Sequence, residues 1–294
     1  MKFAGIIAEY DPFHNGHAWQ LAQAKALGAE RVAVAMSCSL VQRGALPLLP
    51  EAVRTRSALT CGADLVFALP APCACAGAEA FARAGVALLA AAGCDGLVFG
   101  AETPDAALLM EAAELLDSGS YRAALKAQLA GGARSFAAAR QAAAAQLASD
   151  ERVAALLDKP NNNLAVEYCR AIRSLAPRME AYPLPRQGAN HGEALHSAHG
   201  QFASASALRK LWAEGGADAV APYVPEAVFP LYQEAYAAGQ YTDFSAAGRC
   251  ELALLRSACR GKAPFADIRG VSEGLEHRLE AAVRTSTTYD ELLD

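Results

Sequence analysis

The chain has 294 residues, of which 53% are hydrophobic and 19% are charged. This balance excludes an intrinsically disordered chain and provides for a large buried core. The net charge of −5 excludes a general basic coat for nucleic acid, so a polyanion could be bound only by local basic patches. The first apolar run, 1–7, is too short for a signal peptide or a membrane span. We therefore expect a cytoplasmic protein with no membrane partner.

Short apolar segments alternate with longer helical segments through the first two-thirds of the chain. The predicted strands are 2–8, 31–36, 64–69, 96–100 and 179–184. The predicted helices are 16–27, 51–60, 78–92, most of 104–150, a segment after 161, and 204–213. Strands of this length separated by helices indicate βαβ units. We therefore predict an α/β fold, a Rossmann-like, doubly wound, five-stranded parallel sheet with helical insertions.

Prolines become frequent from Gly216 onward, and the helical segments become short. We place a domain boundary there, with an ATP-binding catalytic domain at 1–215 and a small helical region at 216–294. Residues 216–294 carry 12 acidic and 7 basic side chains, so a polyanion is expected to contact the first domain.

The eight cysteines include no Cys-x-x-Cys pair. In a chain without a predicted signal peptide we expect reduced, mostly buried thiols. His191, His196 and His199 have a loosely metal-like spacing, but no cysteine is near them and glycines flank them. An exposed loop is therefore favoured over a zinc site, and no metal ligand is assigned.

The most informative segment follows the first predicted strand and reads Asp11-Pro-Phe-His-Asn-Gly-His17. Ligands bind at the carboxyl edge of a parallel sheet, and a helix that begins there directs its free N–H groups and positive dipole end toward a phosphate. Gly16 removes a side chain where the backbone must approach the ligand. His14 and His17 are three residues apart, so both imidazoles share a face with Gln20 and could stabilise charge on a phosphoryl group.

This segment is similar to the His-x-Gly-His signature of the nucleotidyltransferase superfamily. The longer string from Gly5 to His17 more closely resembles the bacterial tRNA(Met) cytidine acetate ligase family. Further segments match that family in the same order: 36–44, 63–70, 95–102, 159–162, 204–209 and 271–276.

The resemblance implies an enzyme that activates acetate with ATP, forms acetyl-adenylate and releases pyrophosphate. The acetyl group would then pass to N4 of the wobble cytidine of elongator tRNA(Met). Mg²⁺ is expected to accompany ATP, because a triphosphate requires charge neutralisation. His14 and His17 would be catalytic. The implied ATP-binding residues are Ile7, Ala8, Glu9, Tyr10, Asp11, Pro12, Phe13, His14, Asn15, Gly16, His17, Gln20, Gly100, Asn161, Asn162, Arg186 and Gln187.

Each of the more distant residues has a physical reason to be there. Gly100 ends a predicted strand, where adenine or ribose can contact bare backbone. Asn161 and Asn162 offer donors and acceptors at a helix start, and Arg186 ends the last strand and can bind phosphate as a fork. The segment 204–209 resembles the superfamily's late Ser/Thr-x-x-Arg motif, a second helix N-terminus facing the β- and γ-phosphates.

The chain departs from the family pattern at three places on the presumed substrate side. Asp11 stands where the family usually has asparagine, Ala45 follows the Gln-Arg-Gly loop in place of glutamate, and Glu51 replaces a lysine. Family members also continue beyond this chain with a basic helical segment, so we expect region 216–294 to be truncated relative to them.

Two other functions remain open from the sequence. An adenylyltransferase that joins AMP to a small phosphorylated metabolite would need the same phosphate-binding loop. A non-catalytic nucleotide- or RNA-binding relative would be compatible with Glu51 and the short C-terminal region. For tRNA, the predicted contact patch is Arg43, Arg54 and Arg56, in or after the Gln-Arg-Gly loop.

Overall fold

A five-stranded parallel sheet forms the centre of the structure, a computed structural model that describes residues 1–132, 135–185, 195–197, 200–261, 264–268, 271 and 274–293. Its strands are β1 (Phe3–Ala8), β2 (Arg31–Ser37), β3 (Leu65–Leu69), β4 (Gly96–Ala101) and β5 (Glu180–Pro185). Their order across the sheet is β3-β2-β1-β4-β5, with every pair parallel. The chain therefore reverses its winding direction between β1 and β4, as the predicted doubly wound fold requires, and the prediction is confirmed. This reversal point is where such sheets bind ligands.

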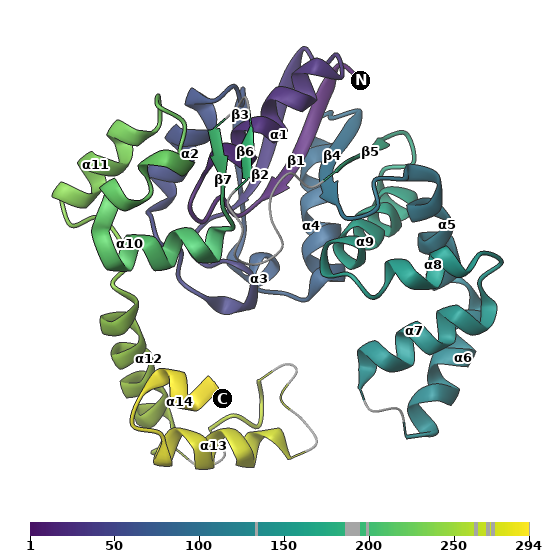
Figure 1. Cartoon of the computed structure of the whole chain (residues 1–294). Helices are drawn as coiled ribbons and strands as arrows, with labels where there is room; N and C mark the ends of the chain where they lie inside the picture. The colour runs from purple at the N-terminus through teal and green to yellow at the C-terminus, as the bar shows by residue number, and fades with distance from the viewer. Residues whose placement is uncertain are drawn as a thin grey trace. The chain divides into compact units, whose positions relative to one another are not determined.

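Helices cover both faces of the sheet (Figure 1). On one face lie α4 (Ala78–Ala91), α5 (Ala106–Asp117) and α9 (Pro160–Leu175), and on the other α1 (Asn15–Ala26), α2 (Glu51–Thr60), α10 (Ala205–Ala219) and α11 (Phe229–Ala237). The shorter or peripheral elements are α3 (Ala71–Ala74), α6 (Gly119–Ala130), α7 (Phe136–Leu147), α8 (Glu151–Leu156), the 3₁₀ turns η1 (Gln42–Gly44) and η2 (Ala221–Tyr223), and the hairpin β6 (Leu195–Ser197) and β7 (Gly200–Phe202). Among the longer helices, α5, α6, α7 and α10 begin at Asp105, Ser118, Ser135 and Ser204, whose side chains accept a backbone N–H of the first turn.

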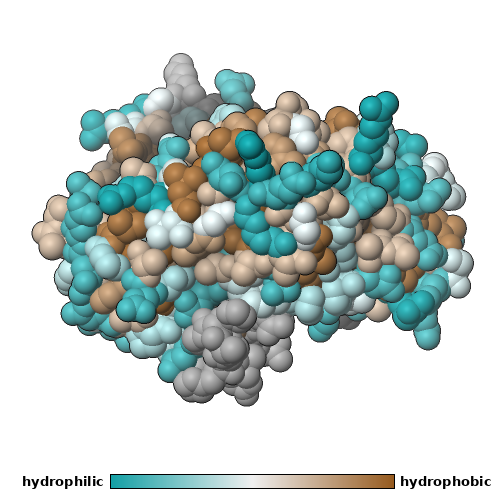
Figure 2. Space-filling view, turned by 90° about the horizontal axis from the view of Figure 1, so that it is seen from above, coloured by the Kyte–Doolittle hydropathy of each residue, from teal (hydrophilic) through white to brown (hydrophobic). Residues whose placement is uncertain are grey.

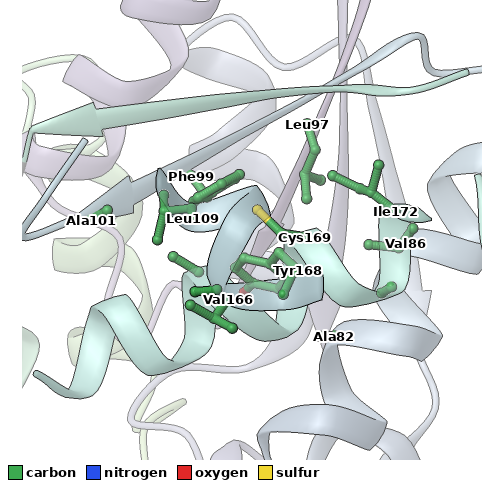
Figure 3. Packing of buried hydrophobic residues seen from close by; sticks show 14 of the residues in the cluster. Ala82, Val86, Leu97, Phe99, Ala101, Leu109, Val166, Tyr168, Cys169 and Ile172 are labelled. Carbon is green, nitrogen blue, oxygen red and sulfur yellow. The ribbon is translucent and has the colours of Figure 1, made fainter. Parts of the chain in front are cut away.

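Alternation along the strands divides the core into two layers. In β2, Val32, Val34 and Met36 pack toward α1 and α2, whereas Ala33 and Ala35 pack toward α4 and α9. Figure 3 shows the second layer, where Tyr168, Cys169 and Ile172 of α9 meet residues of β4 and α4. Small residues allow this close approach: a Cβ at Gly85 of α4 would lie 2.5 Å from Ile7 Cδ1 in β1. Helix α4 is therefore held tightly under the strand that leads into the site.

The chain divides into two compact units, Met1–Gln240 and Tyr241–Asp294. The composition shift at Gly216 lies inside the first unit, within α10, where Gly216 has a φ of +66°. The unit continues to Gln240 because Val220, Val228 and Tyr232 are fully buried in the same cluster as β1 and β2. The residues after Gly216 thus complete the core under α1.

The second unit consists of α12 (Phe244–Ala258), α13 (Leu275–Thr285) and α14 (Tyr289–Leu293). Cys259, Phe265 and Val283 form its small core. No helix among the residues described has the length and apolar character needed to cross a membrane. Figure 2 shows hydrophilic side chains spread over one face of the molecule, with apolar residues in small groups between them.

Candidate functional site

The loop between β1 and α1 is anchored by buried aromatic residues. Tyr10 and Phe13 are buried, and their rings meet edge to face with centroids 4.9 Å apart. The Tyr232 hydroxyl of α11 donates to the Phe13 carbonyl at 2.7 Å. Tyr10 has a φ of +52°, an uncommon conformation for a residue with a side chain. This loop is therefore held from beneath, so that the residues on either side of Phe13 have fixed positions.

The two histidines of the motif build the first turn of α1. His14 is the N-cap residue, and its Nδ1 accepts the Gly16 N–H at 3.0 Å. His17 returns the interaction, since its Nδ1 accepts the His14 N–H at 3.3 Å, and the two rings stack with centroids 3.8 Å apart. A neutral imidazole whose Nδ1 accepts a hydrogen bond carries its proton on Nε2. The capping box thus sets one tautomer in both rings, with Nε2–H as the donor.

Asp11 lies below the histidines and is only 3% exposed. Its Oδ1 accepts the Leu48 N–H at 2.6 Å, and its Oδ2 pairs with Arg209 Nη1 of α10 at 3.1 Å. The same Arg209 nitrogen donates to the Asp11 carbonyl at 2.7 Å. Burial raises the pKa of Asp11, although the Leu48 N–H, Arg209 and Arg54 act in the opposite direction. Asp11 therefore connects the α1 loop to α10.

Glu9 directly follows β1, and its side chain contacts the η1 turn that comes after β2. Its Oε1 accepts the Gln42 N–H of η1 at 2.5 Å. Burial raises the pKa of Glu9, and the negative charge of Asp11 adds to this effect against the opposing influence of Gln42, Arg209 and Arg54. The carboxylate is therefore held between the ends of two adjacent strands.

Arg54 is fully buried behind these carboxylates. Its guanidinium donates to the carbonyls of Glu9 at 2.7 Å, Ser37 at 2.6 Å and Leu49 at 3.0 Å, and also to that of Cys38. Arg54 therefore joins the ends of β1 and β2 to α2, and it cannot contribute to the predicted tRNA patch. That part of the prediction is wrong because the backbone carbonyls that end parallel strands required a buried donor. Arg56 is exposed and lies 3.6 Å from Glu234, and the side chain of Arg43 lies outside the described part.

On the β4 side, Glu102 organises the start of α9. Its carboxylate accepts the backbone N–H groups of Asn161 at 3.2 Å and Asn162 at 2.6 Å, and the Asn161 side chain at 2.6 Å. Burial alone would raise the pKa of Glu102, but these hydrogen bonds outweigh it and the pKa is lowered. Asn162 is turned away into the protein, where its side chain binds Thr103. The N-terminus of α9 is thus already occupied by a carboxylate.

A cleft of about 390 Å³ lies between these elements, at the carboxyl ends of β1, β4 and β5. The sequence-predicted residues that line it are Ile7, Ala8, Glu9, Tyr10, Asp11, His14, Gly16, His17, Gln20, Gly100 and Asn161. Pro12, Phe13, Asn15 and Asn162 do not line it. Asn15 is buried and donates to the carbonyls of Gln201 and Pro222, so it supports the fold of the site. Arg186, Gln187, His191 and His199 lie outside the described residues, as does the side chain of His196.

Further residues that were not among the predicted ATP-binding residues also line the cleft. They are Trp19, Gln42, Phe81, Phe99, Leu164, Tyr168, Leu184, Pro185, Ala203, Ser204 and Ala205. Gln42 and Ser204 lie in the segments 36–44 and 204–209, and the resemblance of these segments to the family was the sequence signal for them. Phe81 and Tyr168 could not be identified from the sequence, because the patterns of α4 and α9 are those of ordinary amphipathic core helices. Ser204 and Ala205 bring the N-terminus of a second helix, α10, to the cleft.

No group of three or more His, Cys, Asp or Glu side chains that could hold a metal ion occurs among the described residues.

The strand order and the His-x-Gly-His helix start at the winding reversal define a nucleotidyltransferase-type α/β protein. A family model described as HIGH nucleotidyl transferase matches residues 1–294. A tRNA(Met) cytidine acetate ligase of Syntrophotalea carbinolica is 37% identical over all of this chain and 69% of its own length. One from Acetivibrio thermocellus is 33% identical over all of this chain and 72% of its own length. The chain belongs to the HIGH nucleotidyl transferase family, in its tRNA(Met) cytidine acetate ligase branch.

Solved structures agree with this placement. Apo Thermotoga maritima TmcAL superposes with a TM-score of 0.91 and 30% identity, covering all of this chain and 70% of that one. The same protein bound with alpha-thio ATP superposes with a TM-score of 0.89 over the same shares.

Proposed function

We propose that this protein is an ATP-dependent acetate ligase that forms acetyl-adenylate and transfers the acetyl group to N4 of the wobble cytidine of elongator tRNA(Met). The observation that carries the proposal is the cleft at the winding reversal, where the His14–His17 capping box opens α1. The names of the relatives, together with the alpha-thio ATP bound by the Thermotoga protein, support the same reaction. We also propose that it acts in the cytoplasm, where tRNA and ATP are present.

Two helix N-termini favour a triphosphate in this cleft. The first turns of α1 and α10 both reach it, through Gly16 and through Ser204 and Ala205. Each provides backbone N–H groups and the positive end of a helix dipole. Adenine would occupy the β4–β5 side, where Gly100 exposes bare backbone beside Leu184 and Pro185. Arg186 and Gln187, which follow β5 in the sequence, are proposed to bind ATP from that side.

In the first step, an acetate oxygen attacks the α-phosphorus and the bond to the pyrophosphate oxygen breaks. Negative charge grows on the non-bridging oxygens, and the Nε2–H groups of His14 and His17 are suited to stabilise it. Mg²⁺ would arrive as the counter-ion of ATP and balance the charge of the departing pyrophosphate. We therefore propose it as part of the substrate.

Incubation with ATP and acetate, with and without tRNA, tests the proposal. Acetate-dependent pyrophosphate release and N4-acetylcytidine in tRNA are the expected results. Release that requires a phosphorylated metabolite instead of acetate would identify an adenylyltransferase. ATP binding without any pyrophosphate release would identify a non-catalytic relative, and either result would refute the ligase.

A further inference from the structure

The proposed placement of ATP leaves one half of the cleft unassigned. Adenine and the phosphates are accounted for by the β4–β5 side and by the starts of α1 and α10. The lining residues there are Glu9 and Gln42, which are joined by a hydrogen bond, and Phe81 of α4 and Tyr168 of α9. This half presents one carboxylate within an otherwise aromatic and amide-bearing wall. It is the place left for the molecule that receives the acetyl group.

The position of Glu9 is fixed from two directions. Its Oε1 is engaged by the Gln42 N–H at 2.5 Å, and its backbone carbonyl is held by the buried Arg54 at 2.7 Å. Among the described residues, none donates a hydrogen bond to its Oε2 and none forms an ion pair with its carboxylate. Oε2 is therefore the part of the carboxylate that a ligand in the cleft can reach.

Burial makes Glu9 a stronger base than an exposed glutamate. Burial is the largest cause and raises the pKa of Glu9, and the negative charge of Asp11 raises it further. The Gln42 hydrogen bond, second in strength, lowers the pKa without cancelling this rise. Tyr168 is close enough to Glu9 to be affected by its charge. Burial raises the pKa of Tyr168, and the negative charge of Glu9 contributes to that rise. A general base is most effective when its pKa is near the working pH, so the shift is in the useful direction.

We propose that Glu9 is a catalytic residue of the second step, in which its Oε2 accepts a hydrogen bond from the exocyclic amine of the acceptor cytosine and then takes the proton of that amine. The inference rests on the proposed function. A carboxylate only accepts hydrogen bonds, so it matches the N4 amine of cytosine and opposes the O4 carbonyl of uracil. One group would thus both select the base and activate it.

The second step transfers the acetyl group from acetyl-adenylate to N4 of the cytosine. The N4 lone pair forms a bond to the acetyl carbonyl carbon, and the bond from that carbon to the AMP phosphate oxygen breaks. AMP leaves with the bonding electron pair. One N4 proton passes to Glu9 Oε2, which later releases it to water, and the other stays on the amide product. No oxidant, reductant or further reactant is required.

The test separates the two steps in Glu9→Gln, which keeps the side-chain shape and removes the base. Acetate-dependent pyrophosphate release reports the first step, and chemically prepared acetyl-adenylate added with tRNA reports the second. We expect the rate of transfer from acetyl-adenylate, relative to pyrophosphate release, to fall by roughly 10²–10⁴. Glu30→Gln is the matched control, because Glu30 is exposed at the start of β2, at the opposite edge of the sheet, and should leave the ratio unchanged.

The pH dependence provides a readout that a structural role would not change. Glu9 must be ionised to accept the proton, so the wild-type transfer rate should rise with pH through its raised pKa. This rise should be absent in Glu9→Gln and retained, at a lower rate, in Glu9→Asp, which keeps a carboxylate one methylene shorter.

Three outcomes would overturn the inference: transfer by Glu9→Gln at the wild-type rate, an unchanged pH profile, or pyrophosphate release slowed as much as transfer. The last would place Glu9 in adenylate formation. A wild-type protein that releases no pyrophosphate with acetate would refute the proposed function itself, and the inference with it.

Discussion

At the scale of single residues, the site depends on backbone hydrogen bonds that orient a few side chains. His14 accepts the Gly16 N–H and His17 accepts the His14 N–H, both through Nδ1, so the same bonds that cap α1 also set the donor face of each ring. The buried carboxylate of Asp11 and the partly buried carboxylate of Glu9 are likewise held by the N–H groups of Leu48 and Gln42. A change in one of these side chains therefore alters chemistry and local structure together, and tests must separate the two.

His17→Ala should lower acetate-dependent pyrophosphate release by roughly 10²–10³, the usual cost of losing a donor that stabilises transition-state charge. The rate of release at saturating ATP is the measurement, with the melting temperature recorded to detect loss of the helix cap. His277→Ala serves as the control, because His277 is exposed in the second unit and should leave the rate unchanged. Equal rates in His17→Ala and the wild type would remove His17 from the mechanism.

Asp11→Asn should raise the melting temperature at pH 7. The folded-state pKa of Asp11 is raised by burial, so the charged carboxylate opposes folding at neutral pH, and this penalty disappears as the pH falls through that pKa. We expect the gain to shrink as the pH is lowered from 7 toward about 4, near the pKa of an ordinary aspartate. Thermal unfolding at the two pH values measures it.

Asp64→Asn is the matched control for Asp11→Asn, and its expected change in melting temperature has the opposite sign. Hydrogen bonding from Lys25 lowers the pKa of Asp64, so Asp64 stabilises the fold at neutral pH and loses this effect as the pH falls through its folded pKa. Asp64→Asn should therefore lower the melting temperature at pH 7. A drop of equal size in Asp11→Asn would show that the Arg209 pair outweighs the cost of burial.

At the scale of elements, the site requires the carboxyl ends of β1 and β2 and the first turns of α1 and α10 to meet at the same place. Strands β1 and β2 end beside α2, and the starts of α1 and α10 meet above them. Arg54 of α2 links the ends of β1 and β2 to the start of its own helix through the carbonyls of Glu9, Ser37 and Leu49. Asp11 and Arg209 link the α1 loop to α10. The positions of the helix N-termini are thus coupled to buried polar groups rather than to the loop sequence alone.

Arg54→Ala should destabilise the first unit by at least about 3 kcal/mol, because several buried carbonyls would lose their donor at about 1–3 kcal/mol each. Urea unfolding measures the change. Arg56→Ala, two residues along the same helix, removes an exposed side chain and should stay within about 0.5 kcal/mol of the wild type. Similar stabilities for the two variants would show that the Arg54 hydrogen bonds contribute little.

At the scale of the whole molecule, most of the chain serves one sheet and its two helical layers. The acidic residues 216–294 are divided between the core under α1 and the separate unit Tyr241–Asp294, so the composition shift does not coincide with a structural boundary. The cysteines are distributed through both units as free thiols: Cys38, Cys94, Cys169 and Cys259 are buried, while Cys250 is exposed.

Thiol titration should follow this distribution. Under non-reducing conditions all eight cysteines should react in denaturant, as expected for a protein of a reducing compartment. In the native protein Cys250 should react first. Burial raises the pKa of Cys94 and of Cys169 to about 12, so these thiols should be protected until the fold opens. A shortfall in denaturant, or early labelling of Cys169, would contradict this picture.

The sequence by itself determined the fold class, the family and the segment that forms the loop between β1 and α1. These depend on local patterns: apolar strands of fixed length, helix spacing, and a motif whose residues are neighbours in the chain. It also placed Glu9, His14, His17, Gly100 and Asn161, all of which line the cleft.

Only the tertiary structure decided which other residues complete the cleft and which polar residues are buried. Phe81 and Tyr168 lie on helices whose pattern is that of ordinary core, and they reach the cleft because α4 and α9 pack beneath β1 and β4. Arg54 belongs to a helix that follows the Gln-Arg-Gly loop, yet it points inward because the ends of parallel strands expose carbonyls that need a donor. Burial and hydrogen-bond satisfaction are properties of contacts distant in sequence, so residue type and spacing alone could not distinguish a buried arginine from an RNA-binding one.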